Sequence, residues 1–210
     1  MTKPKRNRYF TPVCVALWPW LIVPDTKFKP EGEYKVSLVM EPNSVALLQA
    51  AVAAEVQEAE KALKSANPKI AKYKLVWPIK DQVDEADEPT GNKLVAFSQV
   101  AKVERPGQKT LTFDVAVFDA KKKPFPKNLK MGSGSEVKLC FNVRVVEDKL
   151  NKCIRVKLQI LAAQVLKFVE YTGGDFGFSE EAGYEAPAEV ESTEPAAGAA
   201  PAAGTDNPDF

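Results

Sequence analysis

The 210-residue chain is 45% hydrophobic and 27% charged, contains no histidine, and has three cysteines without C-x-x-C spacing. This composition disfavours an enzyme, a zinc site and a disulfide framework, because the usual general base and metal ligands are missing or wrongly spaced; no apolar run approaches the roughly 18 residues that cross a membrane. The formal charge divides into +11 for residues 1–167, with 29 cations against 18 carboxylates, and −10 for residues 168–210, which indicates a polyanion-binding body joined to an acidic competitor.

The first predicted elements are two strands. Residues 9–21 have the aromatic and β-branched content of a strand, and Pro19 near its end predicts an edge position or a β-bulge. A loop that contains proline and glycine is expected over residues 25–32. Residues 33–40 then alternate apolar and polar side chains, which predicts a half-buried strand.

The next segment changes its period. Apolar side chains recur every three or four residues between residues 45 and 63, which predicts one long amphipathic helix. Asn43 or Ser44 is expected to cap its start, and Asn67 followed by Pro68 signals its end. Residues 81–90 are rich in carboxylates and predict a turn-like connection rather than a calcium loop, because the required glycine spacing is missing.

From residue 93 onward the pattern is that of β-strands. We expect strands over residues 93–103, 110–118, 136–146 and 152–169, with turns at 105–107 and 147–151. The last two strands have an apolar face and a largely cationic face. Five or six antiparallel strands with one helix inserted after the second fit a small barrel, for which an oligonucleotide-binding (OB) fold is the natural candidate. Periodicity alone does not separate it from another small β-barrel or sandwich.

The composition changes again near residue 172. We expect one folded domain over residues 1–172 and a disordered acidic tail over residues 173–210, because an Ala/Pro-rich segment buries too little apolar surface to offset its ordering entropy. Asp206, Asp209 and Phe210 would suit capture in a cationic pocket of a partner. A solubilising spacer is the alternative interpretation of this tail.

The strongest candidate site combines cations with aromatic rings. Single-strand binders need this mixture because cations follow the phosphates while rings stack on the bases. The alternative is that the rings are core residues and the lysines only solubilise the barrel. The glycine-rich segment 131–135 lacks the GK[ST] of a phosphate-binding loop and predicts a flexible turn. The candidate DNA-binding residues are Lys35, Lys102, Arg105, Lys109, Lys121, Lys122, Lys123, Lys127, Lys130, Lys138, Arg144, Arg155 and Lys157, with Trp18, Trp20, Trp77, Phe97, Phe118 and Phe125.

Several segments together resemble one known family, the single-stranded DNA-binding proteins of short-tailed bacteriophages. They are GEYKVSLVM (32–40), the segment 117–138 with its MGSGSEVK, VKLQILAAQVLKFVEY (156–171), Gly183 with Tyr184, and the final Asp209 and Phe210. The resemblance implies an OB-fold with an acidic tail ending in phenylalanine, a homodimer, no cofactor, and a location in the cytoplasm of the infected bacterium. It also implies that the protein coats and anneals single-stranded DNA in replication, recombination and repair, and that its tail contacts DNA polymerase and helicase-primase.

Two other classes of protein stay open at this point. An assembly factor would use the basic barrel to bind an acidic protein partner, and it would bind oligonucleotides poorly. An enzyme is the least supported class, because the sequence shows no arrangement of nucleophile, base and metal ligands.

Overall fold

The computed structural model describes residues 7–104, 107 and 109–171. All of these residues belong to a compact unit that spans Met1–Gly173, and a second unit, Gly174–Phe210, lies outside the described residues. The fold described below is therefore that of the first unit. The predicted disorder of the tail and the predicted domain limits stay predictions.

Strands dominate the described residues, with one α-helix and one short 3-10 helix. In chain order the elements are β1 (Tyr9–Phe10), β2 (Cys14–Asp25), β3 (Glu33–Met40), α1 (Pro42–Ala66), η1 (Pro68–Ile70), β4 (Leu75–Val76), β5 (Ile79–Val83), β6 (Pro89–Val100), β7 (Lys102–Val103), β8 (Leu111–Thr112), β9 (Ala116–Phe118), β10 (Glu136–Asp148) and β11 (Cys153–Lys167).

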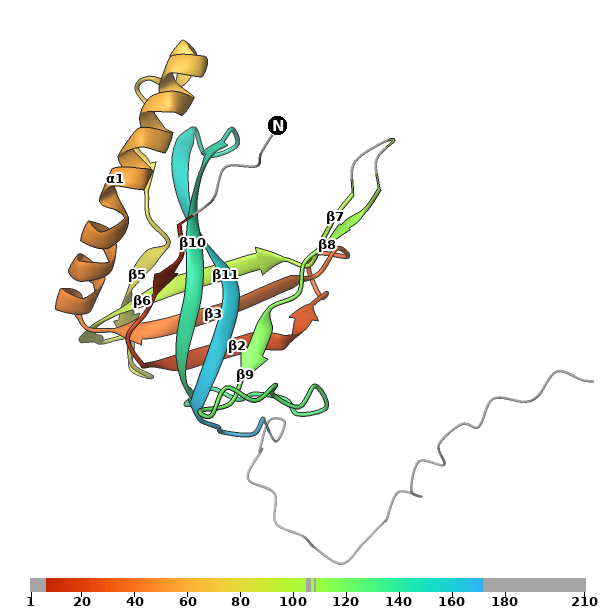
Figure 1. The fold of residues 1–210 in the computed structure, drawn as a ribbon. Coiled ribbons are helices and arrows are strands. Elements are labelled where there is room, and N and C mark those ends of the chain that lie inside the picture. Colours follow the sequence, from red (N-terminus) through yellow and green to blue (C-terminus); the bar gives the residue numbers. More distant parts are fainter. Residues whose placement is uncertain (1–6, 105–106, 108, 172–210) are drawn as a thin grey trace, which may run out of the picture. The chain divides into compact units, whose positions relative to one another are not determined.

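One sheet contains nine of these strands. Its order is β4-β11-β10-β2-β3-β6-β5, with β1 paired to β10 and β9 paired to β11, while β7 and β8 form a separate hairpin. Strands β2, β3 and β6 cross β10 and β11 steeply, as in a small orthogonal barrel, and α1 lies beside β10 and β6 (Figure 1). The predicted class, a mainly β OB-like barrel with one long inserted helix, is confirmed.

The interior of the barrel follows the predicted alternation. Side chains at alternate positions of β3, β10 and β11 are buried, and the rings of Phe97 and Phe141 meet edge to face with centroids 5.2 Å apart. Helix α1 contributes Val45, Leu48, Val52 and Val56 to the same core. The 3.6-residue period places these four on one stripe, so the helix covers the barrel with its apolar face.

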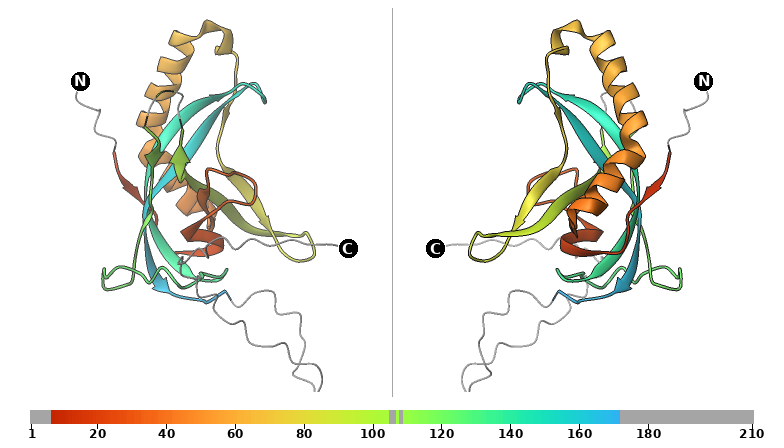
Figure 2. Two further views of the ribbon diagram at one scale, coloured as in Figure 1. Left: turned by 90° about the vertical axis from the view of Figure 1, so that its right-hand side faces the viewer. Right: turned by 90° about the vertical axis from the view of Figure 1, so that its left-hand side faces the viewer.

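The turn between β10 and β11 lies at the same end of the barrel as the C-terminal end of α1 (Figure 2). The loop between β9 and β10, residues 119–135, lies at the other end, beside the end of β11. We call this segment the basic loop, because it carries Lys121, Lys122, Lys123, Lys127 and Lys130.

The N-cap lies two residues before Asn43 and three before Ser44, so neither predicted cap is correct. Glu41 is the N-cap residue and makes no side-chain capping bond, and Pro42 occupies the first turn. Proline suits this position because its missing N–H would have no helical partner there. The predicted end is confirmed, since Asn67 is the C-cap residue.

The predicted strand over residues 9–21 is divided. Thr11 separates β1 from β2 because its hydroxyl accepts the N–H of Leu139 while its own N–H donates to the Leu139 carbonyl, both at 3.0 Å. The bulge predicted from Pro19 is confirmed, because the pairing of β2 with β3 shifts register between Leu17 and Trp20.

Residues 110–118 do not form the single predicted strand. They contain β8 and β9, and the segment between them turns inward at Val115, which is buried. The Asp114 carboxylate accepts a hydrogen bond from the Tyr34 hydroxyl at 3.2 Å. Strand β9 then pairs in parallel with β11, as β4 also does, so the sheet is mixed rather than wholly antiparallel.

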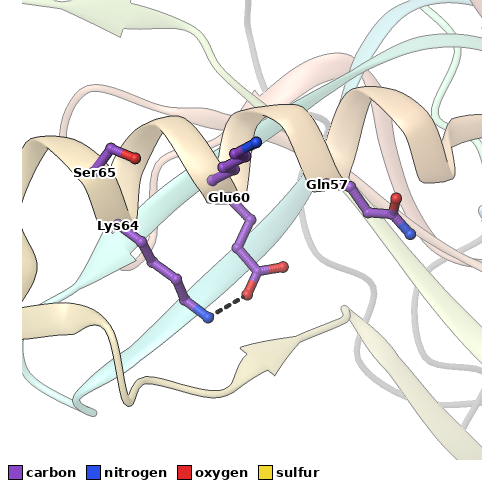
Figure 3. A pocket seen from close by; sticks show the side chains of 5 residues that line it. Gln57, Glu60, Lys64 and Ser65 are labelled. Atoms are coloured by element: carbon purple, nitrogen blue, oxygen red, sulfur yellow. Dashed lines mark ion pairs between the residues drawn. The ribbon is translucent and has the colours of Figure 1, made fainter.

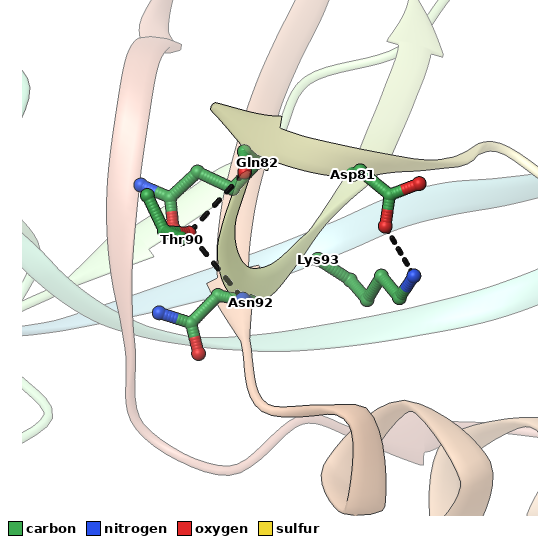
Figure 4. A network of polar contacts seen from close by, with 5 residues as sticks. All are labelled: Asp81, Gln82, Thr90, Asn92 and Lys93. Carbon is green, nitrogen blue, oxygen red and sulfur yellow. Dashed lines mark hydrogen bonds and ion pairs between the residues drawn. The ribbon is translucent and has the colours of Figure 1, made fainter. Parts of the chain in front are cut away.

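The acidic segment 81–90 is part of a β-hairpin rather than a plain linker. Strands β5 and β6 pair around a turn in which Asp84 Oδ1 accepts the N–H groups of Ala86 and Glu88, both at 2.9 Å. Figure 4 shows the polar side chains of this hairpin, including the ion pair between Asp81 and Lys93. The carboxylates of Asp81 and Asp84 are thus used within the hairpin itself.

The three cysteines are free thiols. Cys14 and Cys153 are buried and Cys140 is half-buried. Burial raises the pKa of the Cys14 thiol to about 11, so this thiol stays protonated at neutral pH. Cys14 is therefore a buried thiol of low reactivity.

Candidate nucleic-acid interface

The bulge in β2 presents two tryptophans on the outside of the barrel. Trp18 adopts a left-handed backbone conformation with φ of 48°, which costs a residue other than glycine about 1–2 kcal/mol. Its N–H donates a hydrogen bond of 2.9 Å to Ser133 Oγ. The side chains of Trp18 and Trp20 are 63% and 44% exposed. The strained backbone therefore does not serve to bury the Trp18 ring.

A hollow lies beside these rings. It has a volume of about 430 Å³ and is lined by residues 18–23 of β2, by part of the basic loop, and by Tyr171 after the end of β11. Most of its wall is apolar or aromatic, while Lys130 and Ser133 supply polar groups. We call it the Trp18 pocket.

The glycine-rich segment 131–135 holds this pocket together, and it contains the predicted turn at Ser133 and Gly134. Ser135 is buried, and its carbonyl accepts the N–H of Ala16 at 2.8 Å. The Ser135 hydroxyl donates to the Gly132 carbonyl at 2.9 Å and accepts the N–H of Val169 at 3.0 Å. A Cβ at Gly132 would lie 3.1 Å from the carbonyl oxygen of Glu170. The turn thus fixes the basic loop to both β2 and the end of β11.

A second group of exposed rings and cations lies next to Trp20. Trp20 is directly opposite Lys35 of β3, so both side chains lie on the same face. Lys35 Nζ is 6.0 Å and Lys27 Nζ is 5.5 Å from the ring centroid of Phe28, which is 78% exposed in the loop between β2 and β3. We call Trp20, Lys35, Phe28 and Lys27 the Phe28 platform. Trp20 joins it to the Trp18 pocket.

Asp25 holds the central cation of this platform. Its Oδ2 atom is 2.5 Å from Lys35 Nζ, and its Oδ1 atom accepts the N–H of Lys27 at 2.9 Å. The hydrogen bond from Lys35, followed by that from Lys27, lowers the pKa of the Asp25 carboxyl. The carboxylate thus neutralises Lys35 within the platform.

The remaining predicted cations are divided among other elements. Arg144 and Lys157 are opposite each other on β10 and β11, and Arg155 Nε pairs with Asp148 Oδ2 at 2.6 Å near the far end of the hairpin. Lys138 Nζ lies 5.8 Å from the Phe10 ring. Lys102 and Lys109 belong to the arms of the β7–β8 hairpin, whereas Arg105 and the tail residues Asp206, Asp209 and Phe210 lie outside the described residues. The cations do not therefore form one set around the pocket.

The predicted aromatic rings also differ in how exposed they are. Phe97 is only 1% exposed in the core, so its assignment as a DNA-binding residue is wrong. Trp77 and Phe125 are half-buried and pack against the core, and Phe118 is half-buried in β9. Of the six predicted rings, Trp18 and Trp20 are the exposed ones.

Sequence reasoning missed three exposed rings near cations, Phe10, Phe28 and Tyr171. For Phe28 a signal was present, because a ring between Lys27 and Lys29 in a polar loop has no strand face to bury it. For Tyr171 the sequence contained no such signal. Its place in the pocket depends on the hydrogen bond that its N–H donates to the Lys130 carbonyl, which is 2.9 Å long.

A hollow on α1 is a poor alternative site. It has a volume of about 380 Å³ and is lined by Gln57, Glu60, Lys61, Lys64 and Ser65, all from one helix. Figure 3 shows the ion pair within it, in which Lys64 Nζ lies 2.6 Å from Glu60 Oε1. It offers no ring, and its carboxylate neutralises one of its cations.

The part of the chain that the structure describes shows neither a metal-binding cluster nor a membrane-spanning helix. Over residues 7–104, 107 and 109–171, no cluster of three or more His, Cys, Asp or Glu side chains is placed to hold a metal ion. Within the same described residues, no helix has the length and apolar character needed to cross a membrane.

No protein-family model and no curated protein matches the sequence. Among solved structures, gp2.5, a single-stranded DNA-binding protein encoded by bacteriophage T7, is 22% identical with a TM-score of 0.64, over 87% of this chain and 100% of its own. The single-stranded DNA-binding protein of bacteriophage Enc34, in complex with single-stranded DNA, is 16% identical with a TM-score of 0.53, over 79% of this chain and 89% of its own. The chain therefore has the fold of these bacteriophage single-stranded DNA-binding proteins.

Proposed function

We propose that this protein binds single-stranded DNA with little sequence preference. The observation that carries the proposal is the continuous line of exposed rings and cations from the Phe28 platform through Trp20 to the Trp18 pocket. Such a line meets both needs of a single-strand binder, because cations follow the phosphates and rings stack on bases of any identity. The shared fold with the T7 and Enc34 proteins, which bind single-stranded DNA, supports it.

Duplex DNA fits this surface poorly. Base readout in a duplex needs an element that enters the major groove, usually a helix with Arg, Asn or Gln. Helix α1 instead packs its apolar stripe on the barrel, and it contains no arginine. The rings of β2 also need unpaired bases, since paired bases hide their faces in the stack.

A competition experiment tests the proposal. Full-length protein is titrated into a labelled oligo-dT of roughly 16 nucleotides, the upper site size of one OB-fold, and unlabelled single-stranded or duplex competitors of equal length are added. The proposal predicts tight binding to the single strand and displacement mainly by single-stranded competitors. Equal displacement by duplex would contradict it, and absence of binding at low salt would favour the acidic-protein partner instead.

We further propose that the protein coats single strands during phage DNA replication, recombination and repair, promotes their annealing, and acts as a homodimer in the cytoplasm of the infected bacterium. The sequence resemblance and the shared fold support this proposal. An annealing assay with complementary strands tests the activity, and light scattering of the full chain tests the dimer. Failure to accelerate annealing would leave the protein as a binder alone.

The acidic tail is proposed to compete with DNA and to contact the replicative DNA polymerase and helicase-primase. The support is the charge division, +11 against −10. Truncation after Gly174 is expected to strengthen DNA binding at low salt and to abolish binding to the polymerase. An unchanged affinity for DNA would identify the tail as a spacer.

A further inference from the structure

We propose that the Trp18 pocket captures one unstacked nucleobase of the bound single strand. This inference rests on the proposed function and deepens it, because it separates a base enclosed by a pocket from bases that stack on an open surface. Its first support is size and lining, since about 430 Å³ of largely apolar space lies between Trp18, Trp20 and Tyr171. Ligand pockets of about 300–1,000 Å³ bury most of a small aromatic group.

The second support is the strained backbone at Trp18, which carries a ring that stays on the surface. Trp18 has a φ of 48°, a conformation normally left to glycine or asparagine, yet its side chain is mostly exposed. A structure that needed only the bulge would favour glycine at this position. Strain of this kind is concentrated at functional sites, where the surroundings hold it in place. Here the Ser133 hydroxyl oxygen accepts a hydrogen bond from the Trp18 N–H and so fixes this backbone conformation.

The third support is charge complementarity around the opening. Lys130 lines the pocket, and the basic loop that carries it holds four further lysines. Asp119 Oδ1 accepts the N–H groups of Lys121 and Lys123 at 2.8 Å, which orders the turn that presents them. A nucleotide whose base enters the pocket would leave its phosphate near Lys130, at one side of the basic loop. An uncharged apolar ligand would gain nothing from this cation.

Three variants of the full-length chain test the inference. Trp18→Gly removes the ring while suiting the left-handed backbone, so it keeps the fold better than Trp18→Ala. Val23→Trp keeps the native rings but fills the pocket from a position that is 52% exposed. Leu47→Ala changes a 72% exposed side chain on α1 and serves as the matched control. Thermal unfolding is measured for each, to show that it is folded.

Each variant is titrated with oligo-dT and with a strand of equal length in which every nucleotide is abasic. We expect Trp18→Gly and Val23→Trp to bind oligo-dT about 5- to 150-fold more weakly than the native chain, the range for one stacked base. All variants should bind the abasic strand with the native affinity, since only phosphates contact the protein there. Leu47→Ala should match the native protein on both strands.

Other results would overturn the inference in distinguishable ways. Weaker binding by Trp18→Gly but not by Val23→Trp would mean that the ring stacks outside the pocket. Tighter binding of oligo-dT by both variants would mean that the pocket holds a segment of the chain itself, such as the one ending at Phe210. Native affinity in both would exclude the pocket from DNA binding. If the native chain binds neither strand, the proposed function itself fails.

Discussion

Phe28→Ala is the substitution for which we expect the clearest difference between the effect on DNA binding and the effect on stability. The side chain is 78% exposed, so Phe28→Ala removes little buried surface, and we expect its unfolding free energy to stay within about 0.5 kcal/mol of the native value. The ring nevertheless stands beside Lys35 and Lys27, where a base stacked on it would have its phosphates close to both cations. Loss of one stacked base costs about 1–3 kcal/mol, or roughly a 5- to 150-fold lower affinity for oligo-dT.

The assay is fluorescence anisotropy of labelled oligo-dT at two salt concentrations. Stacking involves no counterion release, so Phe28→Ala should weaken binding by the same factor at both. Leu47→Ala, which removes an equally exposed apolar side chain from α1, is the control and should change neither affinity nor stability. An affinity of Phe28→Ala within twofold of the native value would refute the platform, as would a loss that disappears in higher salt.

Four further predictions follow from the same geometry. Lys35→Gln should reduce the slope of log affinity against log salt by about 0.7, because one phosphate contact is lost, and a salt titration measures this. Asp25→Asn should strengthen binding of oligo-dT, because it frees Lys35 from its ion pair. The pKa of the Asp25 carboxyl is lowered, so the ion pair is complete above the ordinary value near 3.9 and is lost only as pH falls through the lower folded value. The native chain should therefore lose Tm over that acid range, and the variant should lack this change. Gly132→Ala should lower Tm, because its Cβ would press on the Glu170 carbonyl. Phe141→Ala should destabilise the barrel by about 3–5 kcal/mol in denaturant titration, because it opens a cavity in the core.

The parts of the fold that sequence predicted well are those with one clear period. Strands β10 and β11 alternate apolar and polar residues, and burial of one face leaves a single register possible. The prediction of helix α1 was equally reliable, because its apolar residues recur every three or four positions. The error at the helix start arose because Pro42 favours the first turn without any capping side chain.

The assignments of individual rings failed where the period was absent. Around Phe97 the sequence reads Leu-Val-Ala-Phe, apolar on both faces, so nothing indicated that the ring points inward. In β2 the bulge at Trp18 changes the side on which later residues emerge, and only Pro19 signalled it. Phe28 was missed although it stands between Lys27 and Lys29 in a polar loop, where no strand face could bury it. The Trp18 pocket depends on contacts among three distant segments, which no local pattern records.

The salt dependence of binding tests the central claim most directly. Seven cations lie in the Phe28 platform and the basic loop: Lys27, Lys35, Lys121, Lys122, Lys123, Lys127 and Lys130. If all seven neutralise phosphates, log affinity of the full chain for oligo-dT should fall with log salt at a slope near −5, or about 1,000-fold for a fourfold rise in salt. Binding that is absent at low salt, or that does not change with salt, would contradict the account.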